Sequence, residues 1–325
     1  MIRRHGNPAG RTPGGKRIIG DSAKRAEQRG GQHGTLSPRL VARTSARVTP
    51  IFDRTTRRLR RDRAQPRYGE HDFLRAAMLD GLAGRLDAVK RPITALLDLG
   101  CFDRAFVAPP SARVARVDTG YRFARASGGV QGDEDRLPFA DASFDCVVSA
   151  GVLDQVDDLP GALALVRRVL RPDGVFLGAF LGAGSLSTLR ACLREAEAER
   201  PAARLHPQVD VRAAGDLLMR AGLTLPVADV EMLSVRYGSL ARLLEDLRGM
   251  AGTSILIERP PLSRAVLARA SAAFAAMADA DGRTTERFHI VYLTGWAPDP
   301  SQPTPARRGS ATASMATALK PKASP

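Results

Sequence analysis

Short apolar runs alternate with longer amphipathic segments through the middle of this 325-residue chain. Four runs have the length and composition of buried strands, at 95–99, 114–117, 144–149 and 175–180. Residues 159–170 have the spacing of a helix, with Asp158 before it and Pro172 after it. This alternation predicts an α/β fold, a doubly wound and mostly parallel sheet with helices on both faces.

Downstream of these runs, the pattern predicts further helices and two more strands. Helical spacing covers four segments, 185–200, 211–221, 239–247 and 263–279. Ser185 is the predicted N-cap of the first of them. Strand signals lie at 227–235 and 288–296, and the alternation in the second suits an antiparallel C-terminal edge strand. Another helical pattern, at 72–86, precedes the first strand.

The composition divides the chain into three parts. Residues 1–50 are rich in Arg, Gly and Ser without a sustained apolar period, which predicts a disordered basic arm. Residues 51–297 form the predicted folded domain, with a core at about 90–182 and a helical cap with C-terminal strands at about 183–297. Residues 298–325 are rich in Pro, Ser, Thr and Ala, and we expect a disordered tail.

The net charge of +15 is concentrated at the N-terminus. Residues 1–68 carry 18 Lys and Arg against 4 Asp and Glu, which leaves 31 basic and 30 acidic residues in the rest. A basic arm could bind nucleic acid, anionic lipid or an acidic partner. The near-neutral remainder argues against a nucleic-acid-binding domain and favours a solvated extension.

Cysteine and histidine usage excludes several kinds of site. The three cysteines, Cys101, Cys146 and Cys192, have no CxxC spacing, which argues against a disulfide framework and for a reducing compartment. The five histidines are scattered, so no metal site is predicted. No apolar run is long enough for a membrane span.

Two phrases carry the first indication of function. Gly-Asp-Glu-Asp-Arg-Leu-Pro-Phe occupies 132–139, and Val-Leu-Arg-Pro-Asp-Gly-Val-Phe occupies 169–176. Their order and spacing resemble the second half of a class I S-adenosylmethionine (SAM) methyltransferase domain. The resemblance implies a Rossmann-like fold with SAM as cofactor. Pro172-Asp173-Gly174 itself has the composition of a turn between helix and strand.

The loop after the first predicted strand departs from that pattern. Such loops need glycines so that the backbone can approach the cofactor, and only Gly100 is present. Phe102 and Arg104 follow it, and a phenylalanine there would tend to fill the cofactor space. Pro109 and Pro110 then predict that the helix after this strand is short or absent.

Other candidate cofactor positions are intact. Ligands of open α/β sheets bind at the carboxyl ends of the strands, where Asp118 could accept hydrogen bonds from ribose hydroxyls. Asp133 could accept one from the adenine amino group, although an ordinary turn role is the alternative. The full candidate set is Asp98, Gly100, Cys101, Asp118, Asp133, Glu134 and Ser149. Asp154 and Gln155 follow the central strand at the expected substrate side, and no catalytic residue is assigned.

Further phrases resemble one family, the fifth NADH dehydrogenase (complex I) assembly factor, which is related to malonyl-carrier O-methyltransferases. They are Ile51-Phe52-Asp53-Arg54, Leu97-Asp98-Leu99-Gly100-Cys101, Leu137-Pro138-Phe139, Val156-Asp157-Asp158-Leu159-Pro160, Thr188-Leu189-Arg190, Glu195-Ala196-Glu197, Asp246-Leu247-Arg248-Gly249-Met250, Tyr292-Leu293-Thr294-Gly295-Trp296 and Arg308-Gly309-Ser310-Ala311-Thr312.

This resemblance implies a protein partner, a subunit of respiratory complex I, and modification of an arginine by hydroxylation. The composition suits the bacterial cytoplasm, with the mitochondrial matrix, peripheral to the membrane, as the alternative. The altered loop keeps a second function open, a non-catalytic assembly chaperone that retained the fold and lost SAM binding. Single candidates such as Asp118 or Cys101 do not distinguish an enzyme from such a chaperone.

Overall fold

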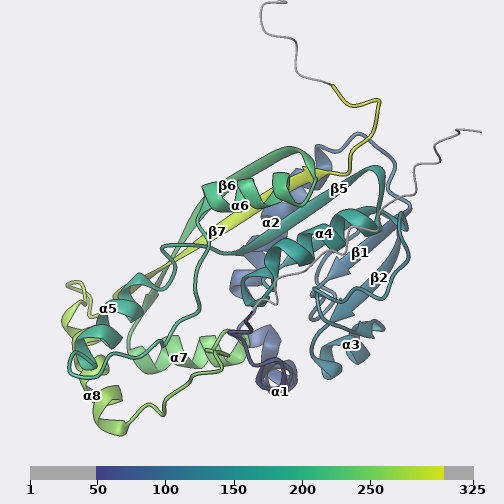
Figure 1. Ribbon diagram of the computed structural model, residues 1–325. Coiled ribbons are helices and arrows are strands. Elements are labelled where there is room, and N and C mark those ends of the chain that lie inside the picture. Colours follow the sequence, from purple (N-terminus) through teal and green to yellow (C-terminus); the bar gives the residue numbers. More distant parts are fainter. Residues whose placement is uncertain (1–48, 304–325) are drawn as a thin grey trace, which may run out of the picture. The chain divides into compact units, whose positions relative to one another are not determined.

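A computed structural model describes residues 49–303 of the protein. Its centre is one seven-stranded sheet in the order β3-β2-β1-β4-β5-β7-β6 (Figure 1). The strands are β1 (Ala95–Leu99), β2 (Arg113–Asp118), β3 (Val130–Gln131), β4 (Phe144–Ala150), β5 (Leu170–Leu181), β6 (Thr224–Tyr237) and β7 (Thr284–Trp296). Only β7 runs antiparallel to its neighbours, β5 and β6.

The predicted fold class is therefore confirmed, and all four apolar runs are strands of the parallel part. Two details differ from the sequence prediction. The outermost strand is β6, so β7 lies one place inside the edge. The Arg-Pro-Asp-Gly phrase lies within β5 rather than before it, and Asp173 adopts a φ of +61° where the β4–β5 register shifts.

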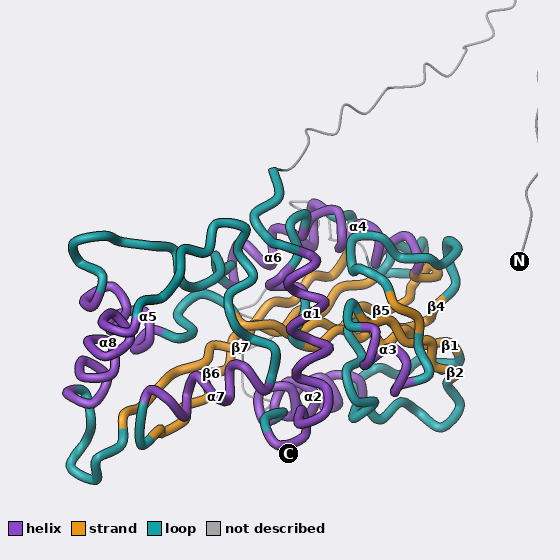
Figure 2. Tube along the Cα trace, turned by 90° about the horizontal axis from the view of Figure 1, so that it is seen from below, coloured by secondary structure: helices purple, strands orange, loops and turns teal. Residues whose placement is uncertain are grey.

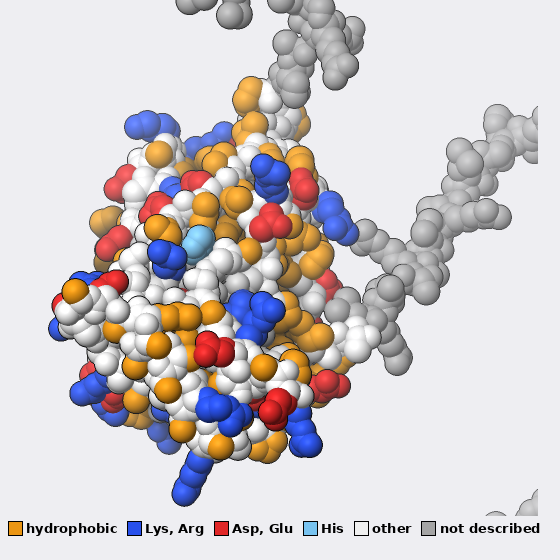
Figure 3. All heavy atoms as spheres, turned by 90° about the vertical axis from the view of Figure 1, so that its left-hand side faces the viewer, with side chains coloured by type: hydrophobic (Ala, Val, Ile, Leu, Met, Phe, Trp, Pro, Cys, Tyr) orange, Lys and Arg blue, Asp and Glu red, His pale blue; other side chains and the backbone are white. Residues whose placement is uncertain are grey.

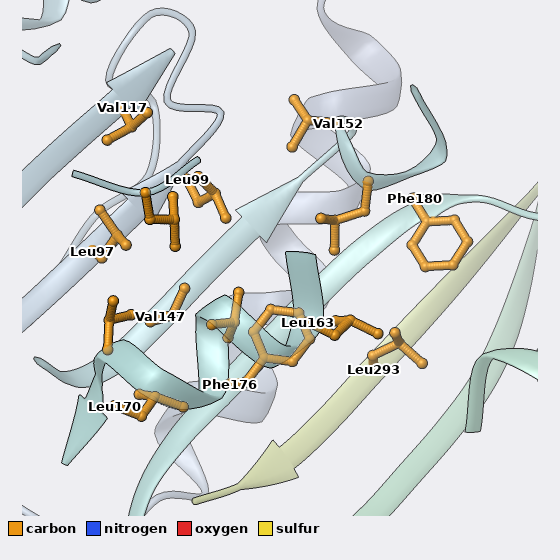
Figure 4. Packing of buried hydrophobic residues seen from close by; sticks show 14 of the residues in the cluster. Leu97, Leu99, Val117, Val147, Val152, Leu163, Leu170, Phe176, Phe180 and Leu293 are labelled. Carbon is orange, nitrogen blue, oxygen red and sulfur yellow. The ribbon is translucent and has the colours of Figure 1, made fainter. Parts of the chain in front are cut away.

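Helices cover both faces of the sheet because each strand presents apolar side chains alternately to the two sides. On one face, α4 (Leu159–Val169) and α6 (Val211–Arg220) pack over a core that includes Leu97, Val147 and Phe176 (Figure 4). On the other face, α2 (Phe73–Asp87) packs over Leu96 and Val148. These helices do not cover the carboxyl ends of β1 and β2, and α1 (Arg54–Ala64) contacts the end of β2.

A helical cap extends the far ends of β6 and β7. It consists of α5 (Ser187–Ala196), α7 (Leu240–Gly249) and α8 (Arg264–Ala276), which share a third apolar cluster. Seen from the cap side, hydrophobic, basic and acidic side chains are interspersed on the surface (Figure 3). Ser185 is not the cap of α5: Leu186 takes that position with φ +57°, and the Ser185 hydroxyl bonds the backbone of His289.

Two helices were missed from the sequence, α1 (Arg54–Ala64) and α3 (Tyr121–Ser127). The segment α1 contains six arginines and one large apolar residue, so it lacks the apolar stripe that marks a surface helix. Asp53 caps it by accepting from the Thr56 amide. Figure 2 shows α1 between the cap helices and the side of the sheet that holds β1, β2 and α3 (Tyr121–Ser127).

Two short 3₁₀ helices complete the described segment. They are η1 (Gln65–Glu70), directly after α1, and η2 (Leu153–Gln155), directly after the turn that follows β4. No helix in the range 49–303 combines the length and the apolar character needed to cross a bilayer. The predicted arm and most of the predicted tail lie outside the described residues, so the domain boundaries stay a prediction.

Candidate functional site

The loop after β1 has the positive-φ backbone of a glycine-rich loop but only one glycine, Gly100. Gly100 has φ +79°, and a Cβ there would lie 2.4 Å from the Val152 side chain. Phe102 and Arg104 also have positive φ, +45° and +69°, in a region that favours glycine. The segment 100–112 contains no helix, as Pro109-Pro110 predicted. Packing of the protein itself, against Val152, is sufficient to explain the one retained glycine.

The Phe102 side chain fills the space above this loop. Its ring stacks on Tyr68 at 4.8 Å between centroids and meets Phe123 edge-on at 5.2 Å. The guanidinium carbon of Arg61 lies 3.8 Å from the Phe102 ring centroid, a cation–π contact. All three rings are buried. The ring therefore occupies space that a glycine at position 102 would leave free.

Asp118, the candidate ribose acceptor, closes β2 and is fully buried. Its Oδ1 accepts from Arg61 Nε at 2.9 Å and from the Gly120 amide at 2.7 Å. Its Oδ2 accepts from Arg61 Nη2 at 2.5 Å and from the Phe102 amide at 3.0 Å. A carboxylate offers about four acceptor sites. All of those of Asp118 are used by groups of the protein.

The neighbouring acidic residues are engaged in the same way. The Glu134 carboxylate binds both terminal nitrogens of Arg57, at 2.6 and 2.8 Å. Asp133 accepts from Arg54 at 3.1 Å and from Arg58 at 2.8 Å. Each cationic partner is an arginine of α1, so one helix neutralises the acidic side of the cleft. Asp133 Oδ1 has no hydrogen-bond partner among the described residues.

The spacing of the arginines in the sequence could have predicted the ion pairs between α1 and the acidic residues. The four arginines, Arg54, Arg57, Arg58 and Arg61, follow the i, i+3, i+4, i+7 spacing of one helical face. We call this set the α1 arginine face. Asp118 and the acidic run 133–135 supply the opposite charges. A basic helical face and a set of buried acids without other cations are complementary in charge, and a motif of single residues does not reveal this.

Two further candidates, Asp98 and Ser149, are buried without hydrogen-bond partners among the described residues. The nearest cations to the Asp98 carboxylate are Arg75 at 3.8 Å and Arg116 at 4.0 Å. Burial raises the pKa of Asp98 to about 6, against the attraction of those two arginines. Both side chains therefore have acceptor capacity that the protein leaves unused.

Cys101 has a packing role. Its thiol is buried and lies 3.1 Å from the Ser127 hydroxyl. Burial raises the pKa of Cys101 to about 12, so the thiolate needed for nucleophilic attack is not formed at neutral pH. Within residues 49–303, no group of His, Cys, Asp and Glu has the arrangement of a metal site.

Asp154 lies beyond the end of β4, in η2, under the cap. It lines two adjoining cavities of about 50 Å³ each, which share Gln155, Leu181 and Met250. One of its oxygens, Oδ1, has no hydrogen-bond partner in the part of the chain that the structure describes. Burial raises the pKa of Asp154 to about 6. Asp154 is thus an acceptor facing the space between sheet and cap.

The structure places all seven candidate cofactor residues at the carboxyl ends of β1, β2, β3 and β4, but not in a free cleft. The residue types suit a nucleoside cofactor, whereas the arrangement does not. Asp118 and Glu134 have their oxygens bound by Arg61 and Arg57, and Phe102 fills the loop. The roles of these residues toward SAM stay a prediction.

Residues 97–178 match the methyltransferase domain family. Across almost the whole chain, the protein is 34% identical to arginine-hydroxylase NDUFAF5 of Homo sapiens, over 324 residues that cover 94% of this chain and 92% of the human protein. The chain belongs to the NDUFAF5 family. This confirms the family predicted from the sequence phrases, and places the arginine-rich α1 and the cap within the matched length.

This member of the NDUFAF5 family is also similar to methyltransferases that act on a carrier protein. It is 32% identical to malonyl-[acyl-carrier protein] O-methyltransferase of Xylella fastidiosa over 171 residues, which cover 52% of this chain and 57% of that protein. Among solved structures, YcgJ of Bacillus subtilis superposes with a TM-score of 0.49 at 15% identity, covering 68% of this chain and 99% of YcgJ.

Proposed function

We propose that this protein modifies an arginine side chain of a protein partner during assembly of respiratory complex I. Membership of the NDUFAF5 family supports the partner and the residue type, since the relatives' name is arginine-hydroxylase. The fold supports a site at the carboxyl ends of the parallel strands. The location that follows is the bacterial cytoplasm or the mitochondrial matrix, wherever complex I is assembled.

The position of Asp154 is the structural observation that supports this function. A partly buried carboxylate that lines a cavity beyond the end of the central strand, with one oxygen unpartnered among the described residues, is suited to bind a guanidinium. The cavity's other walls come from α2, from Phe102 of the β1 loop, and from Met250 and Gly252 at the end of the cap helix α7. We propose that the partner's arginine enters between sheet and cap and that Asp154 orients it.

SAM is the proposed cofactor, supported by the methyltransferase domain match and by the acidic residues at the strand ends. When bound, SAM supplies an activated methyl group on a sulfonium. In the arrangement described above, the α1 arginine face and Phe102 occupy its place, so we assign no catalytic step to it.

The test measures complex I assembly and arginine mass together. Human cells lacking NDUFAF5 would express this chain, directed to mitochondria, as the parent, as Asp154→Asn, or as Asp279→Asn. Asp279 is a matched control because it is an exposed cap residue remote from the cleft. We expect the parent and the control to restore assembly and the mass gain on a partner arginine, and Asp154→Asn to restore neither.

Other outcomes separate the alternatives. Gain of one oxygen atom on the arginine identifies hydroxylation, and gain of one methylene identifies methyl transfer. Restored assembly with no mass gain on any partner arginine, even with the parent chain, would establish the non-catalytic chaperone instead. If Asp154→Asn restores both assembly and mass gain, Asp154 does not orient the substrate.

A further inference from the structure

The α1 arginine face forms an ion pair with every acidic residue on this side of the cofactor cleft. Arg57 and Arg61 are 4% and 1% exposed, and their carboxylate partners Glu134 and Asp118 are 1% and 0% exposed. Arg54 and Arg58 add partly exposed pairs to Asp133 and Asp135 at the rim. We infer that α1 is an internal, displaceable occupant of the cleft, and that SAM and the docked α1 arginine face bind the same carboxylates in mutual exclusion.

Saturation of the acceptors is the first support. Asp118 receives four donors on two oxygens, of which Arg61 supplies two and the backbone supplies two. A ribose hydroxyl can donate to Asp118 only if one of these donors leaves. The backbone donors belong to the loop and to the strand end, so Arg61 is the donor that can depart without unfolding the site.

The composition of α1 is the second support. Its one large apolar residue, Leu59, is 51% exposed, and of its eleven residues only Arg57, Arg61 and Ala64 are buried. Helices that belong permanently to a core are held by an apolar stripe. Here the middle of the helix is held over the cleft by ion pairs and by the cation–π contact of Arg61 with Phe102, and the net contribution of a buried ion pair after desolvation is small. An ionic contact of this kind is one that a competing ligand can replace.

The other attachments of α1 are the third support, because most of them tie the helix to the cap segment around residue 255. Before the helix, Phe52 pairs with Leu256, and the Asp53 amide donates to the Ile255 carbonyl at 2.8 Å. Within the helix, Asp62 accepts from the Arg122 amide at 2.8 Å, and Arg60 donates to the Thr253 hydroxyl at 2.8 Å. Since Phe52 and Asp53 are bound to the cap segment around 255, a shift of that segment would carry α1 with it.

This inference rests on the proposed use of SAM, and a binding experiment on the full chain tests it without any partner. Isothermal calorimetry with SAM, and with S-adenosylhomocysteine as a second nucleoside ligand, would compare the parent with Arg54→Ala and Arg58→Ala. Each variant weakens the rim of the α1 arginine face while Asp133 keeps one arginine. Arg236→Ala is the matched control, since Arg236 is similarly exposed and also binds two carboxylates, Asp279 and Asp281.

We expect Arg54→Ala and Arg58→Ala to bind both ligands roughly three- to tenfold more tightly than the parent, the range that one or two partly exposed ion pairs support, and Arg236→Ala to match the parent. Hydrogen exchange of the parent supplies a readout that needs no variant. With saturating SAM, the amides of residues 54–64 should exchange faster, because α1 has left the cleft.

Three results would overturn the inference. These are equal affinity of the parent and both variants, slower exchange of residues 54–64 with SAM bound, and no binding of SAM by any variant. Slower exchange would mean that α1 closes over the bound cofactor. The proposed function fails separately, by the absence of a mass gain on the partner's arginine, which this experiment does not measure.

Discussion

Arg61 and Asp118 form a two-point ion pair, from Nε at 2.9 Å and Nη2 at 2.5 Å, in a site that excludes solvent from both side chains. The pair joins α1 to the end of β2. Because Asp118 also accepts from the amides of Phe102 and Gly120, the same carboxylate fixes the loop after β1. A residue expected to bind a ligand thus organises three segments of the protein.

Removing one member of this pair should be costly. Arg61→Ala leaves the Asp118 charge buried without its cation, and we expect a loss of about 3–5 kcal/mol in the free energy of unfolding by denaturant. The double variant Arg61→Met with Asp118→Asn should be less destabilised than Arg61→Met alone, because no charge remains buried. Arg236→Ala, which breaks exposed pairs, should lose under about 1 kcal/mol. Equal losses for the single and double variants would contradict a buried charge.

The two residues with positive φ in the β1 loop should respond oppositely to glycine. Arg104 is exposed with φ +69°, so Arg104→Gly should relieve backbone strain and raise the free energy of unfolding by about 1 kcal/mol. Phe102→Gly relieves similar strain but removes a ring packed on Tyr68 and Phe123, and should cost about 2–3 kcal/mol net. Thermal and denaturant unfolding measure both. A stabilised Phe102→Gly would show that the ring contributes little to the core.

The fold could be predicted from the sequence because its signals are local. The apolar runs in β1, β4 and β5 are buried on both faces, so these strands are visible without knowledge of their neighbours. The missing helix after β1 was predicted for the same reason, since Pro109-Pro110 acts on its own backbone.

The state of the site could not be predicted in the same way. Asp118 and Glu134 were placed correctly at the strand ends, but their partners Arg61 and Arg57 are 57 and 77 residues away in the chain. The α1 segment carries no apolar period, so its helix depends on the acids opposite to it and on the Asp53 cap. Long-range charge complementarity has no sequence period to detect.

The raised pKa of Asp98 predicts how the free energy of unfolding depends on pH. Burial raises its pKa from 3.8 to about 6, so between these values the folded chain holds a proton that the unfolded chain has released. Its carboxyl therefore lowers the free energy of unfolding as pH rises through that window. Asp98→Asn should be more stable than the parent by about 3 kcal/mol at pH 8, and equal to it below pH 4. A destabilised variant at pH 8 would show instead that Arg75 and Arg116 hold Asp98 ionised.

His206 should act in the opposite direction, through the segment that anchors α1. Its Nε2 accepts from the Ile255 amide at 2.9 Å, which requires the unprotonated ring, and the Ile255 carbonyl in turn binds the Asp53 amide. Burial, together with Arg57 and Arg60, lowers the pKa of His206 from 6.5 to about 4. Within that window the unfolded chain binds the proton first, so the free energy of unfolding falls as pH is lowered.

We expect this effect to amount to about 2 kcal/mol between pH 6.5 and 4. Denaturant unfolding across this range would compare the parent with His206→Gln, whose Oε1 can accept from Ile255 without titrating. The Gln variant should lose less stability on acidification than the parent. Asp98→Asn serves as the opposed control, because removing that carboxyl steepens the loss on acidification instead of reducing it. If the His206→Gln and parent curves run parallel, the imidazole is not the group that anchors the cap segment in its unprotonated form.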